Sequence, residues 1–354
     1  MPTSTRAACA SPAAATAAVT HADYFLALRS YVTGPGLAHI ENAIASRLSG
    51  RPVPGRPDRI AITLEKHGEF YHPARLTVAM PDAEISLVLN VALTPVGRSW
   101  MASETAALPR VAARLPTGSV PTVYGQAALP GPAQTPLGLF LADWFDGFHE
   151  FHLSIDRRRG RQAMIVWDTT GAPFFLTEQQ QGEVYRQSAY LLTRAYDPQS
   201  TRQIYPWHHA AGDFILRVEG GPLALRLITV RQYAPTLAGD REALDDDARL
   251  TALMVFFLNL SLRNRLDRLD GTGPAAWADP VALPATVEGV FQALDAKPAN
   301  ALAGLLKTYR VSELIETLEA LAERYGLMPA ETELIRANLA PHAELLCETL
   351  RKMP

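Results

Sequence analysis

The sequence has little cysteine and little net charge, and each shortage limits what the protein can be. Its 354 residues include two cysteines, Cys9 and Cys347, near opposite ends of the chain. Cysteines so placed argue against a disulfide framework or a cysteine zinc site, and they suit a reducing compartment such as the cytoplasm. A formal net charge of −3 gives no general attraction to nucleic acid or to an anionic membrane surface. We therefore expect a cytoplasmic protein that has neither of them as a partner.

Several motifs of common enzymes are also missing. The sequence contains no Gly-x-Ser-x-Gly, no Gly-x-x-x-x-Gly-Lys-Ser/Thr and no His-Glu-x-x-His. The sequence therefore lacks the motifs that usually indicate a serine hydrolase, a P-loop nucleotidase or a zinc protease of the His-Glu-x-x-His type. The longest apolar stretch, residues 250–262, is too short to span a bilayer and contains Asn259 and Ser261. It predicts a buried helix of a globular protein.

The composition that is present favours a folded chain with a large core. Hydrophobic residues make up 48% of the sequence and charged residues 19%. The length is natural for two fused lobes. Residues 1–21 are rich in Ala, Thr, Ser and Pro, so we expect a disordered leader there and not a secretory signal.

The spacing of apolar residues predicts the order of helices and strands. Helical periodicity covers residues 22–48, with a break at 33–36. Three strands joined by short turns follow, which is typical of an antiparallel meander, at 60–64, 74–80 and 85–93. A helix at 99–113 separates them from strand signals at 120–124 and 137–144. A helix at 178–196 precedes two strands around Gly220, at 214–218 and 223–230. The remainder is helical, at 250–269, 287–294, 311–325 and 331–351.

This order of elements resembles the kinase-like fold, in particular that of aminoglycoside phosphotransferases and choline kinases, over residues 55–265. The resemblance implies an α+β protein with two lobes: an N-terminal antiparallel sheet with one helix, and a mainly helical C-terminal lobe. We place the N-terminal lobe at 22–138 and the C-terminal lobe at 139–300. Residues 301–354 would form a helical extension.

In the N-terminal lobe the resemblance matches one family residue and breaks at another. Glu104 falls where the family has a glutamate that pairs with a lysine of the third strand, but the lysine position is Asn90. An amide cannot neutralise phosphates as an ammonium does. Without that partner, Glu104 could equally be a solvated helix residue. Residues 139–144, including Asp143, resemble the strand that links the lobes and meets the adenine ring, although an edge strand and turn would look the same.

The catalytic loop of the family can be aligned here in two registers. In one register His209 takes the position of the catalytic aspartate, and Phe214 takes that of the asparagine. In the other Asp213 is the candidate base, and Val218 stands at the asparagine position. Thr229 replaces the metal-binding aspartate in both. A threonine hydroxyl is a weak ligand for Mg²⁺, so the resemblance implies that most of the stabilisation of phosphoryl transfer is gone.

The loop can also be interpreted from its own chemistry. His208, His209 and Asp213 could form a general-base pair or bind a metal, yet no other cluster completes a zinc or iron site. Alternatively, His209 bonds the backbone of a tight loop. Because the hairpin around Gly220 returns the chain, we expect Asp213 to be partly buried and paired with Arg231. The guanidinium would then replace a metal, or it could bind a phosphate or carboxylate ligand.

These features lead to three hypotheses. The first is a kinase-like protein with degenerate catalytic motifs that binds an unknown small molecule or protein in the inter-lobe cleft. The second is an atypical phosphotransferase that uses Asp213 or His209 as base. The third is a non-enzymatic interaction protein whose helices at 311–351 carry the function. The resemblance assigns five residues to the cofactor site: Asn90, Glu104, Asp143, Thr229 and Arg231. Any ATP binding should be weak and nearly independent of Mg²⁺, and we expect no resident metal.

Overall fold

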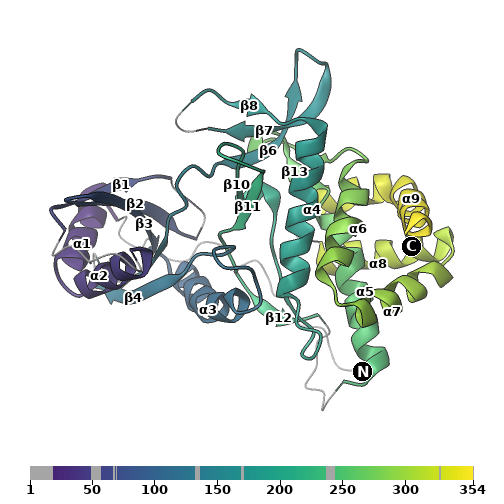
Figure 1. The fold of residues 1–354 in the computed structure, drawn as a ribbon, viewed down its shortest axis with the longest axis horizontal. Coiled ribbons are helices and arrows are strands. Elements are labelled where there is room, and N and C mark those ends of the chain that lie inside the picture. Colours follow the sequence, from purple (N-terminus) through teal and green to yellow (C-terminus); the bar gives the residue numbers. More distant parts are fainter. Residues whose placement is uncertain are drawn as a thin grey trace. The chain divides into compact units, whose positions relative to one another are not determined.

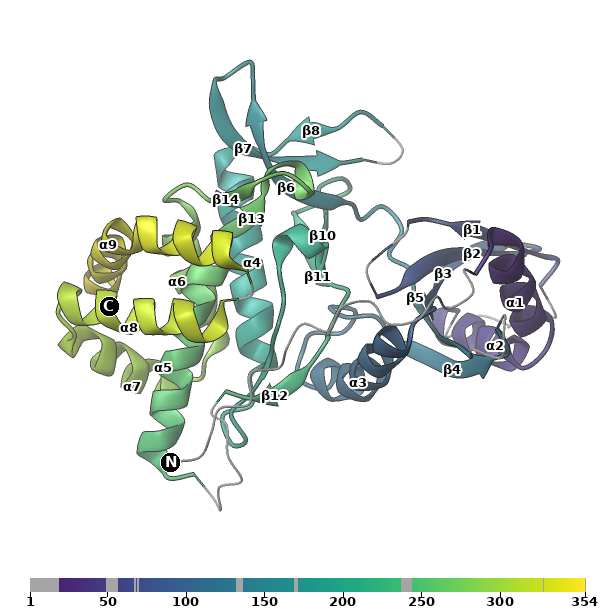
Figure 2. The same cartoon turned by 180° about the vertical axis from the view of Figure 1, so that it is seen from behind.

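A computed structural model describes residues 19–48, 57–66, 68, 70–131, 136–168, 171–236, 244–326 and 328–353 (Figures 1 and 2). Most of the predicted leader, with Cys9, lies outside the described residues. The chain divides into two compact units, Met1–Met101 with Val123–Trp144, and Ala102–Thr122 with Phe145–Pro354. The lobe boundary at 138/139 stays a prediction.

The first unit contains the antiparallel sheet predicted from the strand signals. Its strands are β1 (Arg59–Leu64), β2 (His72–Met80), β3 (Ala83–Ala92), β4 (Val123–Leu129) and β5 (Leu137–Asp143). They lie in the order β1-β2-β3-β5-β4, and every neighbouring pair is antiparallel. Helix α3 (Pro95–Ala112) connects β3 to β4. The predicted α+β class with its antiparallel sheet is confirmed.

Apolar side chains on both faces hold this sheet in place. Helices α1 (His21–Thr33) and α2 (Gly36–Arg47) cover one face, where Leu28 and Ile40 belong to the same buried cluster as Leu87 (Figure 1). On the other face Met101 of α3 packs with Val88 and Phe140. Burying a side chain of this size contributes about 1.5–3 kcal/mol. Strand β2 buries alternate residues, whereas strand β3 buries nearly all of its residues. This difference follows the alternating apolar pattern of β2 and the nearly continuous apolar run of β3.

The second unit is mainly helical, as predicted. Its helices are α4 (Glu178–Ala195), α5 (Asp246–Arg263), α6 (Ala282–Ala293), α7 (Ala296–Thr308), α8 (Val311–Tyr325) and α9 (Pro329–Lys352). Its strands are β6 (Glu150–Asp156), β7 (Arg161–Trp167), β8 (Phe174–Phe175), β9 (Arg202–Ile204), β10 (Phe214–Arg217), β11 (Ala224–Leu227), β12 (Tyr233–Pro235), β13 (Leu266–Arg268) and β14 (Ala275–Trp277). In the described part of the chain, none of the helices has the length and apolar character needed to cross a membrane.

Several elements differ from the predictions, among them helix α7, which was not predicted. Helix α5 begins at Asp246, four residues early, because the Asp245 side chain accepts a hydrogen bond from the Ala248 amide and caps it. It also ends early, at Arg263, and residues 266–268 of the predicted helix form strand β13. The sheet formed by β6, β7 and β8 was not predicted at all. The basic run 157–159 is the exposed turn between β6 and β7, so its side chains are solvated.

Candidate functional site

The loop between β9 and β10 carries the predicted catalytic residues, and its shape is fixed by its own side chains. The Nδ1 atom of His208 accepts a hydrogen bond from the Ala210 amide at 2.9 Å and so begins a short 3-10 turn, His209–Ala211. Gly212 ends the turn with φ of +65°, a left-handed value that costs glycine little. The chain then enters β10 with Asp213 pointing inward. The loop is therefore a preformed element of the fold.

Asp213 is completely buried and is already bonded within the protein. Its Oδ2 atom accepts a hydrogen bond from the backbone amide of His208 at 2.8 Å and forms an ion pair with Arg231, whose side chain is 16% exposed. The structure thus shows the pair that was predicted from the hairpin. The Oδ1 atom is also buried and has no hydrogen-bond donor among the described residues. A fixed guanidinium, and not solvent, balances this carboxylate.

His209 is buried among aromatic rings. The ring centroids of Phe151, Tyr185, Trp207 and Phe214 lie 5.6–6.0 Å from its own. Burial lowers its pKa, so the imidazole is neutral near pH 7. Its Nε2 atom lies 3.0 Å from Oδ1 of Asn264. In these surroundings a neutral histidine packs as a flat ring whose hydrogen bond goes to the side chain of Asn264. The neighbouring His208, and not His209, bonds the backbone of the loop.

Asn264 follows α5 and fixes which way His209 faces. Its amide nitrogen donates to the Tyr185 carbonyl at 3.0 Å and to the Thr286 hydroxyl at 2.7 Å. A carbonyl can only accept, so the Asn264 oxygen must face His209. The Nε2 atom of His209 therefore carries the proton and donates. Sequence reasoning missed Asn264 because nothing in the local pattern links it to a loop 55 residues away.

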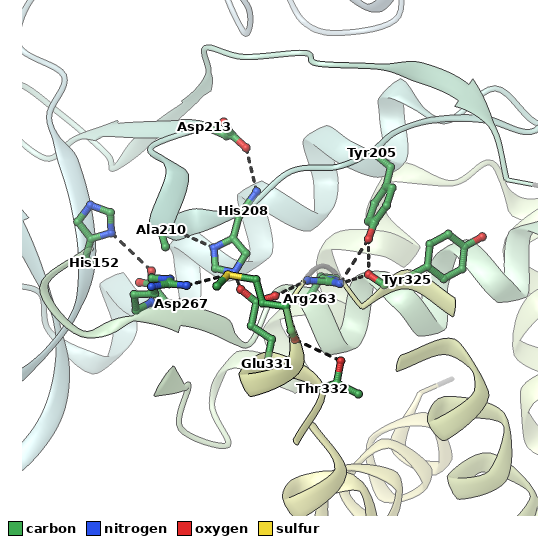
Figure 3. A network of polar contacts seen from close by, with 12 residues as sticks. His152, Tyr205, His208, Ala210, Asp213, Arg263, Asp267, Tyr325, Glu331 and Thr332 are labelled. Atoms are coloured by element: carbon green, nitrogen blue, oxygen red, sulfur yellow. Dashed lines mark hydrogen bonds and ion pairs between the residues drawn. The ribbon is translucent and has the colours of Figure 1, made fainter. Parts of the chain in front are cut away.

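Figure 3 shows a second layer of polar contacts that ties the loop to α9. Because Nδ1 of His208 accepts from an amide, its Nε2 carries the proton, and this atom lies 3.3 Å from Oε1 of Glu331. The other carboxylate oxygen of Glu331 accepts from Arg263 at 3.0 Å. Arg263 also donates to the Tyr325 carbonyl. Residues of the loop, α5, α8 and α9 thus share one buried network.

The carboxylate of Glu331 is ionised in this network. Burial acts to raise its pKa, but the His208 ring 3.3 Å away and the charge of Arg263 together hold the pKa below its ordinary value. Close by lies Asp267, which is labelled in Figure 3. This buried residue accepts from the backbone amides of Leu153 and Arg268, each at 2.7 Å. Neither acidic residue was predicted as part of a site. Their partners are remote in sequence and have no recognisable spacing.

The five residues assigned to a cofactor site fall in different units. Asn90 lies in β3, between Pro73 and Phe140 of the neighbouring strands. Asp143 ends β5 and bonds to Arg47 at 2.9 Å and to the Tyr124 hydroxyl at 2.8 Å. Both residues belong to the first unit.

The other three lie together in the second unit. Glu104 is 1% exposed, and its Oε1 atom accepts from the amide of Val230 at 2.8 Å. Its alternative interpretation as a solvated helix residue is therefore wrong. Thr229 and Arg231 flank Val230 directly after β11, and Arg231 continues to Asp213. The glutamate of α3 thus contacts the segment that begins with Thr229, through the backbone.

A histidine of α9 provides a pH test of this interior. Burial, followed by the nearby charge of Arg265, lowers the pKa of His342 from 6.5 to about 3. The unfolded chain therefore binds a proton that the folded one does not, and the contribution to stability is complete above pH 6.5 and lost as the pH falls toward 3. Between pH 7 and pH 5 we expect His342 to account for a loss of about 2 kcal/mol.

Urea unfolding at the two pH values, for wild type and His342→Leu, measures this loss. The Ser261 hydroxyl near His342 also lies 2.8 Å from the Leu258 carbonyl, so the leucine leaves it a partner. An unchanged difference between the two pH values in the variant would show that His342 does not carry the dependence.

Comparison with known proteins adds no family to this geometry: no model of a protein family matches the chain, and the search of curated proteins found no match.

Proposed function

We propose that this chain is a kinase-like protein, of the aminoglycoside phosphotransferase and choline kinase type, that has lost catalysis and acts by binding. The observation that carries the proposal is the state of Asp213, which is fully buried and paired with Arg231. A catalytic base must accept a proton from a substrate, and a metal ligand must offer its oxygen to a cation. Asp213 can do neither while its charge is neutralised inside the protein.

The order of elements supports the kinase-like part of this proposal. Three antiparallel strands, a helix that carries Glu104, and two further strands complete the sheet. In the second unit a long helix, a loop and the β10–β11 hairpin follow in the order that the resemblance implies. The contact of Glu104 with Val230 favours the same assignment, because it joins the helix to the segment where the family has its metal ligand.

The replaced residues support the loss of catalysis. Phosphoryl transfer depends on a lysine and on metal-bound carboxylates that absorb the charge of the phosphates. Asn90 and Thr229 supply neither, and Arg231 places a permanent positive charge beside Asp213. We propose a small molecule or a protein as the partner, and the cytoplasm as the place of action. ATP is at most a weak ligand.

A nucleotide measurement tests this proposal directly. At millimolar ATP we expect a small shift of the melting temperature, and Mg²⁺ should change the apparent affinity less than about twofold, because the residues that hold a metal–nucleotide complex are missing. The measurement is a thermal shift confirmed by calorimetry, with an active kinase as positive control. A strongly Mg²⁺-dependent stabilisation would favour the atypical phosphotransferase that uses Asp213 or His209 as base.

A further inference from the structure

The β10–β11 hairpin carries two arginines beside one aromatic ring. The register of the hairpin pairs Ile215 with Arg226 and Arg217 with Ala224, so the two arginines lie diagonally on the same face. Phe148 is held next to this face, because the neighbouring residue His149 exchanges two backbone hydrogen bonds with Leu216, at 2.8 and 3.0 Å. The labelled strands β10 and β11 locate the hairpin in Figures 1 and 2.

Both guanidinium groups stack on the ring of Phe148. The Cζ atom of Arg217 is 5.0 Å from the ring centroid, and that of Arg226 is 5.3 Å from it. Distances below about 6 Å allow a cation–π interaction. We call Phe148, Arg217 and Arg226 the basic cluster. A phenyl ring attracts a cation with its faces but carries no charge, so the ring orients the two arginines without neutralising them.

The positive charges of the basic cluster are not balanced within the described residues. No ion pair there joins Arg217 or Arg226 to a carboxylate. The Nε atom of Arg226 is buried and has no acceptor in the same part of the chain. Burial, and then the charge of Arg217, lower the pKa of Arg226. Two like charges are thus held close together at a cost that a bound anion would remove.

We propose that the basic cluster binds the phosphate group of a small-molecule ligand. Two planar guanidinium groups offer several N–H donors, and phosphate accepts them in bidentate pairs. A phosphate monoester carries nearly two negative charges at neutral pH, which matches two uncompensated cations better than a single carboxylate does.

The surroundings of the basic cluster leave room for the rest of such a ligand. Arg226 also lines a groove of about 250 Å³, together with Gln187, Tyr190 and Gln292. The Gln187 side chain is fixed there, because it donates to the Leu223 carbonyl at 2.8 Å and accepts from the Leu225 amide at 2.8 Å. The groove therefore has a polar wall in a defined position. This inference does not depend on the kinase-like assignment, since it uses only contacts within the second unit.

Calorimetry with orthophosphate and pyrophosphate as probes tests the site. We expect saturable binding to the wild type and a loss of affinity of at least about tenfold in Arg217→Met and in Arg226→Met, because each removes a charge-assisted hydrogen-bond donor. Arg158→Met is the matched control. It removes the same charge from the exposed β6–β7 turn and should leave the affinity within about twofold of wild type, as expected for a remote surface charge.

Thermal melting in phosphate-free buffer separates binding from a purely structural role. If the cluster is a binding site, the double variant Arg217→Met/Arg226→Met melts there at or above the wild-type temperature, because the repulsion between the two charges is gone, and it loses the rise that phosphate produces. A wild type that binds neither probe at millimolar concentration would overturn the proposal. Equal binding of acetate and phosphate, or an equal loss of affinity in the Arg158→Met control, would overturn it as well.

Discussion

Replacing Glu331 with alanine is expected to lower the free energy of unfolding by about 3–5 kcal/mol, the usual cost of leaving one member of a buried ion pair alone. Arg263 is 2% exposed and would lose its carboxylate partner, while Nε2 of His208 would lose the acceptor 3.3 Å away. Urea unfolding followed by circular dichroism measures the change. Glu348→Ala is the matched control, since this residue also lies in α9 but is exposed, and within the part of the chain that the structure describes its ion pair is with Lys352.

A second variant shows whether the stranded charge causes the loss. Glu331→Ala combined with Arg263→Met should recover part of the stability, because no unpaired charge then remains inside the protein. Hydrogen exchange should show faster opening of α8 and α9 in the single variant than in the double one. If Glu331→Ala and Glu348→Ala destabilise the protein equally, the network does not anchor α9.

Replacing Asp213 with asparagine is expected to cost about 3 kcal/mol, because Arg231 loses its counter-charge and the His208 amide loses a charged acceptor. The double variant with Arg231→Met should be more stable than the single Asp213→Asn. A double-mutant cycle in urea gives the coupling energy between the two side chains, and the structure predicts a favourable one.

The same variants distinguish the structural role of Asp213 from a catalytic one. A base or metal ligand in an open site contributes little to stability, so Asp213→Asn would then leave the unfolding curve almost unchanged and abolish activity or metal binding. A zero coupling energy with Arg231 would also contradict the structural role. His209→Asn is a useful companion variant. Removing an imidazole that packs among four aromatic rings should lower the stability whether or not this group takes part in a reaction.

Many helices and strands of this fold could be predicted because the spacing of apolar residues within a short stretch of chain indicates them. The alternation in residues 74–80 and the apolar run at 85–93 identify β2 and β3, and the three-and-four periodicity after Glu178 identifies α4. The Asp213–Arg231 contact was also predictable, since the hairpin between the two residues leaves few places for Arg231 to go. In each of these cases the chain between the partners is short or regular.

The rest of the site depends on contacts that no spacing reveals. Glu331 meets Arg263 across 68 residues, and Asn264 meets His209 across 55. The charge of Glu331 in the sequence is equally compatible with the exposed first turn of a helix, which is where most such residues lie. The sheet of β6 to β8 was missed for another reason. Strands β6 and β7 have 7 residues each, but the arginines of the turn between them made the segment resemble a solvated loop.

The link between Glu331 and the loop also orders events during synthesis. A ribosome releases His208 and Arg263 well before residue 331. Both side chains therefore leave the exit tunnel before the carboxylate that they contact in the folded protein. Domains generally fold as they emerge, from the N-terminal side onward. The second unit therefore has to leave the Arg263 cation and the His208 ring open to water until α9 arrives, and the synthesis of α9 completes the interior around the loop.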